Sequence, residues 1–528
     1  MRLVLGVLLA VLATSQVACV IGPRFTRCPG QGGRGWVQLD SDHYTLRTDL
    51  PPEEARRAMS HLERTRVAIL AAMWPGALRR EMTKLTVYVL QDPREFEGLY
   101  PRRVRAFFFK SDTEALIVLP GGPESWEYRF SGLSEASSSR LNHELAHFLS
   151  TYALARQPRW LSEGLAEYLE TLRLSKDGST AVVGTPNPAS VYEMSGILDA
   201  VEDNQGLLTR DPARAWSMEQ RVLAWDRTQQ SGEEDRQIAY LYAGSWLLVH
   251  WLIDERPEAF AEYQALLNGG VPPESALRQA LPGMESPALD LALLKYLRNR
   301  RYRERKVPVP PVGTGFIETV LEDAEVHAIR SKLAELGARL AWREPFIENR
   351  KKLAKAELDE SLRLNPKGLP ALTTQLRSAP KSERPALARA AVEAHPEESE
   401  AWLLLASAQE EDPAAQETSY KKALELEPKS FYAATGLAWL YVTQGRIPEA
   451  LPLAQWAVQL APWSTYALDT YALALAGGGA CDEALRMEQR ALELITEDGD
   501  PELERILRER LVGLSRGEMC APAANPAP

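Results

Sequence analysis

Two histidines and a glutamate in the segment 141–150 (LNHELAHFLS) have the spacing of a catalytic metal site. His143 and His147 are four residues apart, so on a helix both imidazoles lie on the same face and can reach one cation. Zinc accepts neutral imidazole nitrogen, and a catalytic zinc site keeps one position open for water. Glu144 is placed to take a proton from that water rather than to bind the metal. The chain has only seven histidines, so two of them in this spacing around a glutamate form a specific pattern.

A second acidic segment, 160–168 (WLSEGLAEY), follows Pro158 and predicts another helix that folds back on the first. Together the two segments resemble the gluzincin metallopeptidases, the thermolysin and aminopeptidase N-like group of the M-A clan. In that group the glutamate of a WLxEG-type segment is the third zinc ligand. The resemblance implies that zinc is bound by His143, His147 and Glu163. It also implies that Glu144 is the general base.

The same resemblance suggests supporting residues outside the ligand set. Glu167 stands where the thermolysin group places a carboxylate that orients the first histidine, with an exposed helix glutamate as the alternative. Tyr242 or Tyr240 would stabilise the oxyanion, although an aromatic residue at helical spacing also suits a core. His250, on the same predicted helix, is expected to be structural. More broadly, residues 35–300 are similar to bacterial peptidase-like proteins in which a zincin domain is joined to tetratricopeptide repeats.

Short strands and amphipathic helices must position these side chains. Apolar residues alternate or form β-branched runs in some segments and recur at helical spacing in others. Strands are expected at 36–39, 43–48, 85–90, 106–109 and 115–119, and helices at 52–73, 141–152, 160–172 and 240–253. We therefore expect an α+β zincin-like domain over 35–300, with a small sheet and the active-site helices.

An all-helical region is predicted after a proline-rich segment. Residues 306–315 (KVPVPPVGTG) contain three prolines and two glycines, which indicates a semi-rigid linker over 301–320. Helical patterns follow over 321–517, and tetratricopeptide-like repeats are clearest over 399–496. At the 34-residue period of these repeats, Gly479 follows Gly445. Stacked helix pairs of this kind form an all-α solenoid with a concave surface suited to a protein or peptide partner.

The N-terminus has the pattern of an export signal, residues 1–19, with an apolar stretch too short to span a bilayer. Cys19 resembles a bacterial lipoprotein processing site, which implies a lipid anchor. Gln16 departs from that pattern, so ordinary cleavage nearby is the alternative. The chain is therefore expected to leave a bacterial cytoplasm, to become a periplasmic protein, a membrane-anchored lipoprotein or a secreted protein.

Composition excludes several classes of protein. Four cysteines in 528 residues exclude a disulfide scaffold, although Cys481 and Cys520 could pair in an oxidising compartment. The formal net charge of −11 disfavours nucleic acid as the main partner, because phosphate binding requires a basic surface. Residues 518–528 are expected to form a disordered tail.

Two functions fit these patterns. The first is a zinc-dependent peptidase that hydrolyses peptide bonds by metal-activated water with Glu144 as general base, acting either as an endopeptidase or as an aminopeptidase. The second is an exported tetratricopeptide scaffold or binding protein whose zincin domain is inactive. A structural zinc site is a third interpretation. Two histidines with a single further ligand favour an open, catalytic position over it.

Overall fold

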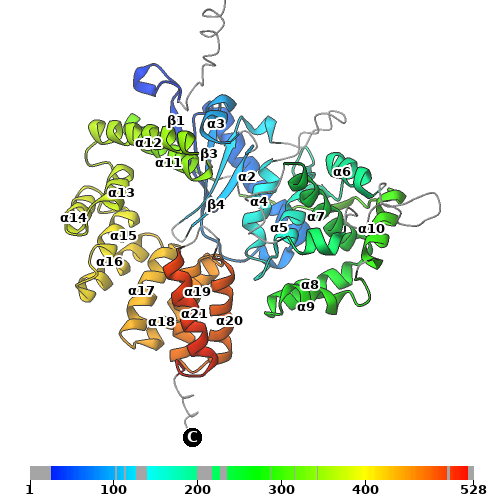
Figure 1. Ribbon diagram of the computed structural model, residues 1–528. Helices are drawn as coiled ribbons and strands as arrows, with labels where there is room; N and C mark the ends of the chain where they lie inside the picture. Colours follow the sequence, from blue (N-terminus) through cyan, green and yellow to red (C-terminus); the bar gives the residue numbers. More distant parts are fainter. Residues whose placement is uncertain are drawn as a thin grey trace, which may run out of the picture.

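The structure is a computed structural model. It describes residues 25–101, 104–111, 114–126, 140–198, 217–225, 235–285, 287–313, 315–341, 343–495 and 500–520. The predicted signal sequence, with Cys19, lies outside these residues. Figure 1 shows a sheet flanked by helices, and an arc of further helices that leaves the sheet at α11 and runs through α13–α16 to α17–α21.

A six-stranded mixed sheet forms the centre of the N-terminal part. Its order is β4-β5-β3-β2-β1-β9, in which β2, β3 and β5 are parallel and the outer pairs are antiparallel. The strands are β1 (Trp36–Asp40), β2 (Tyr44–Thr48), β3 (Leu85–Leu90), β4 (Phe107–Lys110), β5 (Ala115–Pro120) and β9 (Ile317–Leu321). The five strands predicted before residue 120 are confirmed, each bound shifting by no more than one residue.

The central strands of this sheet are buried on both faces, which explains why β3 and β5 are almost entirely apolar. On one face Val87 and Ile117 belong to the core formed with α2 (Pro52–Met73) and α4 (Arg140–Ser150). On the other face Tyr88 and Val118 belong to the core formed with α3 (Pro93–Leu99) and α11 (Asp323–Leu340). The helix with the histidine pair and the first helix of the C-terminal half therefore lie on opposite sides of one sheet.

The prediction of a linker over 301–320 is wrong, because this segment contributes one strand to each of the two sheets that the described residues form. β8 (Arg305–Pro308) pairs with β7 (Thr180–Val183) in a small sheet with β6 (Arg173–Leu174), and β9 pairs with β1. Prolines are tolerated because β8 is an edge strand, where outward amides need no partner. α11 and Ala354 of α12 (Glu344–Leu364) complete the core beside α3. The first body therefore extends through α12, and a boundary at residue 300 falls too early.

Helices cover the remaining side of this body. They are α5 (Arg159–Leu169), α6 (Pro188–Leu198), α7 (Asp235–Glu255), α8 (Pro257–Asn268), α9 (Pro273–Ala280) and α10 (Ala288–Asn299), with a single π-helical turn at Met218–Leu223. The helices predicted at 160–172 and 240–253 correspond to α5 and α7. α4 ends at Ser150, well before Pro158, which instead forms the N-cap of α5.

Stacked helix pairs form the C-terminal solenoid. The helices are α13 (Leu369–Ser378), α14 (Arg384–Ala394), α15 (Ser399–Ser407), α16 (Pro413–Leu426), α17 (Phe431–Thr443), α18 (Ile447–Leu460), α19 (Thr465–Gly477), α20 (Cys481–Glu493) and α21 (Pro501–Ser515). The repeats predicted over 399–496 coincide with α15–α20. Gly445 and Gly479 occupy the same turn of successive pairs with φ of 71° and 81°, a left-handed conformation that favours glycine.

The last helices of the solenoid are joined by a disulfide. Cys481 at the start of α20 bonds to Cys520 after α21, with 5.9 Å between their Cα atoms. Residues 518–520 of the predicted tail are therefore held against the solenoid, and 521–528 lie outside the described residues. In the part of the chain that the structure describes, no helix has the length and apolar character needed to cross a bilayer.

Candidate metal centre

The proposed zinc ligands come from α4 and α5, which pack against each other. α4 buries Leu141, Leu145 and Leu149, so its histidines lie on the opposite, half-buried side. α5 in turn packs tightly on α7 because Gly164 has no side chain. A Cβ at Gly164 would lie 2.5 Å from the carbonyl oxygen of Ser245. The glycine of the WLxEG-type segment is therefore needed for helix packing beside the site.

His143, His147 and Glu163 converge on one point. The two Nε2 atoms are 3.1 Å apart, and Glu163 Oε2 lies 3.6 Å from Nε2 of His143 and 3.4 Å from Nε2 of His147. Zinc–ligand bonds of about 2.0–2.2 Å at tetrahedral angles separate ligand atoms by roughly 3.3–3.6 Å. The spacing of the three atoms is therefore close to what one zinc ion requires.

The second nitrogen of each histidine ring already has a partner. His143 Nδ1 lies 2.9 Å from Glu170 Oε1, and His147 Nδ1 lies 3.0 Å from Ser162 Oγ. Because a carboxylate only accepts, Nδ1 of His143 carries the proton and Nε2 can bind a cation. Within the described residues, the buried Glu163 Oε2 has no hydrogen-bond donor. Two oriented imidazoles and an orphaned carboxylate oxygen fit Zn²⁺ as the bound group.

The electrostatics of the ligand set favour a positive charge at its centre. Burial lowers the pKa of His143, but the carboxylates of Glu163 and Glu170 outweigh burial and raise it well above its usual value. Burial raises the pKa of Glu163, but the imidazoles of His147 and His143 outweigh burial and lower it strongly. A proton and a metal ion therefore compete for the same place.

Glu144 lies beside the ligand set and is held by the edge strand of the sheet. Its Oε2 accepts a hydrogen bond of 2.7 Å from the backbone N–H of Phe108 in β4. Burial raises the pKa of Glu144, and the charges of His143 and His147 act in the opposite direction. A carboxylate with a raised pKa is a better proton acceptor at neutral pH than an ordinary one.

Glu170, not Glu167, is the carboxylate that contacts His143, so the role predicted for Glu167 is corrected. Glu167 Oε2 instead lies 3.3 Å from both Asn187 Nδ2 and Ser190 Oγ. Burial and the neighbouring Glu170 raise the pKa of Glu167 to about 8. Glutamates at 163, 167 and 170 share one helix face by their spacing, which was the available sequence pattern for Glu170.

Tyr242, on α7, is the tyrosine beside the ligand set. Its ring centroid lies 6.4 Å from that of His143 and 5.4 Å from that of Trp225. Tyr240 is two residues earlier and therefore points about 200° away around the helix. The charge of Glu163 and burial raise the pKa of Tyr242 well above its usual value. The Tyr242 phenol therefore keeps its proton and can act as a donor.

His250 is a structural residue, as expected from the sequence. It is fully buried, and its ring nitrogens lie 2.7 Å from Tyr296 Oη and 3.1 Å from the carbonyl oxygen of Gly184. Tyr296 in turn donates to Asp254 Oδ2 at 2.5 Å. These contacts join α7 to α10 and to the loop after β7.

One protein family matches the region that contains these residues. Residues 139–272 match the family described as "Protein of unknown function (DUF1570)". The matched range is less than half of the chain, but it contains α4, α5 and α7 with all the proposed ligands. No curated protein matches the chain.

Three solved structures resemble part of the chain. Two are of MamA, at 20% and 18% identity, covering 29% and 33% of this chain and 96% and 92% of those chains, with TM-scores of 0.24 and 0.25. The third, YrrB, is titled a TPR protein with an unusual peptide-binding site. It is 18% identical and covers 34% of this chain and 92% of its own, with a TM-score of 0.24. None of these descriptions names a peptidase.

Proposed function

We propose that this protein is a zinc-dependent hydrolase that cleaves peptide bonds, with His143, His147 and Glu163 as metal ligands. One observation carries the proposal. Three ligand atoms from two helices lie 3.1–3.6 Å from one another, and a separate half-buried carboxylate, Glu144, lies next to them. The resemblance of both segments to gluzincin peptidases supports the choice of reaction.

Several residues of the chain have separate roles in the proposed hydrolysis. Bound zinc would supply Lewis-acid activation of water and of the scissile carbonyl. Glu144 accepts the proton of the attacking water and returns it to the leaving amine, for which its raised pKa suits it. Glu170 and Ser162 keep the histidine rings oriented through their Nδ1 atoms. Tyr242, which keeps its proton, donates to the oxyanion that develops on the carbonyl oxygen.

Export remains part of the proposal. A disulfide between Cys481 and Cys520 is compatible with an oxidising compartment and would be unusual in a bacterial cytoplasm. The pattern at residues 1–19 agrees with that location, with Cys19 as the residue that would carry a lipid.

Zinc analysis and a peptide-library digest of the same purified sample test the proposal. We expect about one zinc per chain, cleavage of peptides, and loss of cleavage on chelation that added zinc restores. A protein that holds zinc but cleaves no peptide would refute the peptidase proposal.

A second candidate function is a protein-binding scaffold whose metal domain is inactive. The observation that favours it is the set of stacked helix pairs α13–α20, an architecture that commonly presents a concave binding surface. The scaffold needs no metal for its function. Partner binding that is unchanged after chelation, in a protein without hydrolytic activity, would select this candidate.

A further inference from the structure

The C-terminal solenoid contacts the helix that carries the proposed metal ligands. Trp463, in the turn between α18 and α19, packs against Phe148 and Tyr152 of the α4 segment, with both centroid distances 5.7 Å. Trp463 is only 4% exposed and belongs to the same hydrophobic core as the N-terminal helices. Phe431 of α17 completes the contact at 6.2 Å from Trp463. The two halves of the chain therefore share a core at this point.

Polar contacts surround the aromatic residues. Tyr152 Oη donates a hydrogen bond of 2.8 Å to the carbonyl oxygen of Leu460, the last residue of α18. Arg156 forms an ion pair of 2.8 Å with Glu493 of α20. These contacts fix the turn after α4 to the ends of α18 and α20.

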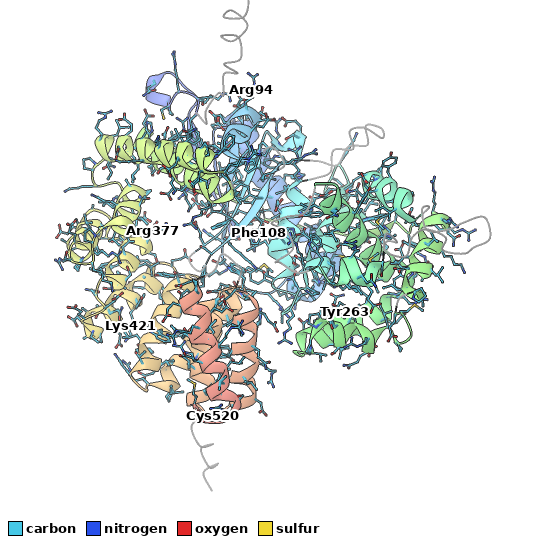
Figure 2. All side chains as sticks on the ribbon, in the orientation of Figure 1. Arg94, Phe108, Tyr263, Arg377, Lys421 and Cys520 are labelled. Carbon is cyan, nitrogen blue, oxygen red and sulfur yellow. A yellow bond between two sulfur atoms is a disulfide. The ribbon has the colours of Figure 1, made fainter. Side chains whose placement is uncertain are left out.

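A continuous path leads from Trp463 to the proposed general base. Phe148 lies one helical turn after Glu144 on α4, so the two side chains share a face. The Phe148 ring also contacts Phe108 of β4, with 5.9 Å between centroids. The backbone N–H of Phe108 is the donor to Glu144. In Figure 2 Phe108 lies near the middle of the molecule, between the solenoid and the helices of the first body.

We propose that Trp463 is a positioning residue for the metal centre. By packing against Phe148 it holds α4 and β4 in the geometry that the ligands and Glu144 require. This inference rests on the proposed function, since it assumes that the ligand set binds a metal. The solenoid is thereby part of the active domain as well as a surface for partners.

The physical reason is that large buried rings leave cavities when they are removed. Loss of the Trp463 ring would leave a cavity beside Phe148 and Tyr152, so α4 and β4 gain freedom to shift. Catalytic and ligand geometry must hold to about 0.5 Å, which makes a metal site sensitive to such shifts. Replacing a residue that supports a metal ligand without binding the metal typically lowers metal affinity or activity about 10–100-fold.

The experiment measures Co²⁺ affinity of full-length variants from the visible absorption of the bound ion. Trp463→Ala should weaken Co²⁺ binding about tenfold, and Trp463→Phe, which keeps a ring, should restore most of the affinity. Trp402→Ala is the matched control, because Trp402 is a solenoid tryptophan that bonds to the carbonyl oxygen of Pro396 and packs against cores made of solenoid residues alone. The control should bind Co²⁺ like the original protein. Peptide cleavage should show a fall in kcat with little change in KM for Trp463→Ala.

Folding is monitored by circular dichroism and thermal melting of each variant. If Trp463→Ala does not fold, Tyr152→Phe removes only the hydroxyl that bonds to Leu460, and should still weaken Co²⁺ binding several-fold. Folded Trp463 and Tyr152 variants with unchanged Co²⁺ affinity would overturn the positioning role while leaving the metal site intact. Failure of the original protein to bind Co²⁺ would overturn the proposed function itself.

Discussion

Glu170 and Ser162 decide which nitrogen of each histidine is available to a metal. Each residue bonds to an Nδ1 atom, so the two Nε2 atoms are left to face Glu163. Partners of this kind fix the tautomer and raise the basicity of the ligand. The carboxylate of Glu170 has the larger effect of the two, because it also carries a charge.

Replacing Glu170 tests this role. We expect Glu170→Ala to lower zinc affinity about 10–100-fold, because His143 loses both its orientation and a neighbouring negative charge. Glu167→Ala is the matched control from the same helix, since Glu167 bonds to Asn187 and Ser190 rather than to a ligand. Competition with a fluorescent zinc chelator measures both affinities. A larger loss in the Glu167 variant than in the Glu170 variant would restore the role predicted from the motif.

The closeness of His143 and His147 was predictable from the sequence because it depends on local spacing. A separation of four positions, as between His143 and His147, defines a shared helix face in any α-helix. The Nδ1 partners were not predictable in the same way. Whether Glu167 or Glu170 reaches His143 depends on the rotation of α5 about its axis, which packing against α7 sets through Gly164.

At the scale of elements, the close approach of α5 and α7 should be sensitive to one added methyl group. In Gly164→Ala the new Cβ would meet backbone at Ser245, which cannot rotate away. Overpacking of about 1–3 kcal/mol should exceed the roughly 1 kcal/mol that alanine gains in a helix. Gly196→Ala is the control, because a Cβ there meets nothing within 4 Å. Urea unfolding should show destabilisation for Gly164→Ala alone, and equal stability of both variants would contradict the packing described.

A buried carboxyl group, that of Glu488, should make the stability of the solenoid depend on pH. Burial and the nearby Asp469 raise the pKa of Glu488 to about 9, so the folded protein keeps this proton at neutral pH. The unfolded chain releases the proton near the ordinary carboxyl value, so stability falls as pH rises from about 5 to about 9. Glu488→Gln should flatten this dependence in urea unfolding. An unchanged pH slope in the variant would show that Glu488 ionises normally.

Elements with a strong local pattern were predictable, whereas pairing across the chain was not. Strands 85–90 and 115–119 are apolar runs of ordinary length, and the structure contains both. β8 and β9 lie in a proline-rich segment that resembles a linker when read alone. Their pairing with β7 and β1 joins residues far apart in sequence, which no local pattern reveals.

For the whole molecule, the position of β9 predicts where the chain can be divided. A fragment ending at residue 305 lacks β9 and α11, so it exposes the edge of β1 and the core around Tyr88. We expect that fragment to aggregate or to unfold without cooperativity. A fragment ending at residue 365, after α12, should fold, because it contains the complete sheet, all of the core around Tyr88, and the core around Val87 except Phe431, Leu460, Ala461 and Trp463. Thermal melting of the two fragments compares them, and a cooperative melt of the shorter one would support a boundary at residue 300.

The modular organisation inferred from the sequence is therefore correct only in part. A sheet-containing body precedes a helical solenoid, but α11 and α12 belong to the first body. Trp463 of the solenoid also packs into the core of that body. The sequence could indicate the two regions because the first has both strand and helix patterns, whereas the second has only helical ones. The contact between them involves single aromatic residues, Phe148, Tyr152 and Trp463, whose pairing has no signature in the order of the chain.

Glu144→Gln, measured for bound zinc and for peptide cleavage on the same sample, tests the central claim most directly. Glu144 lies beside the ligand set and bonds to Phe108, so its replacement should leave one zinc bound per chain. Loss of the general base should lower kcat by about 10²–10⁴-fold. A Glu144→Gln protein that holds zinc and cleaves peptides at the original rate would contradict hydrolysis at this site.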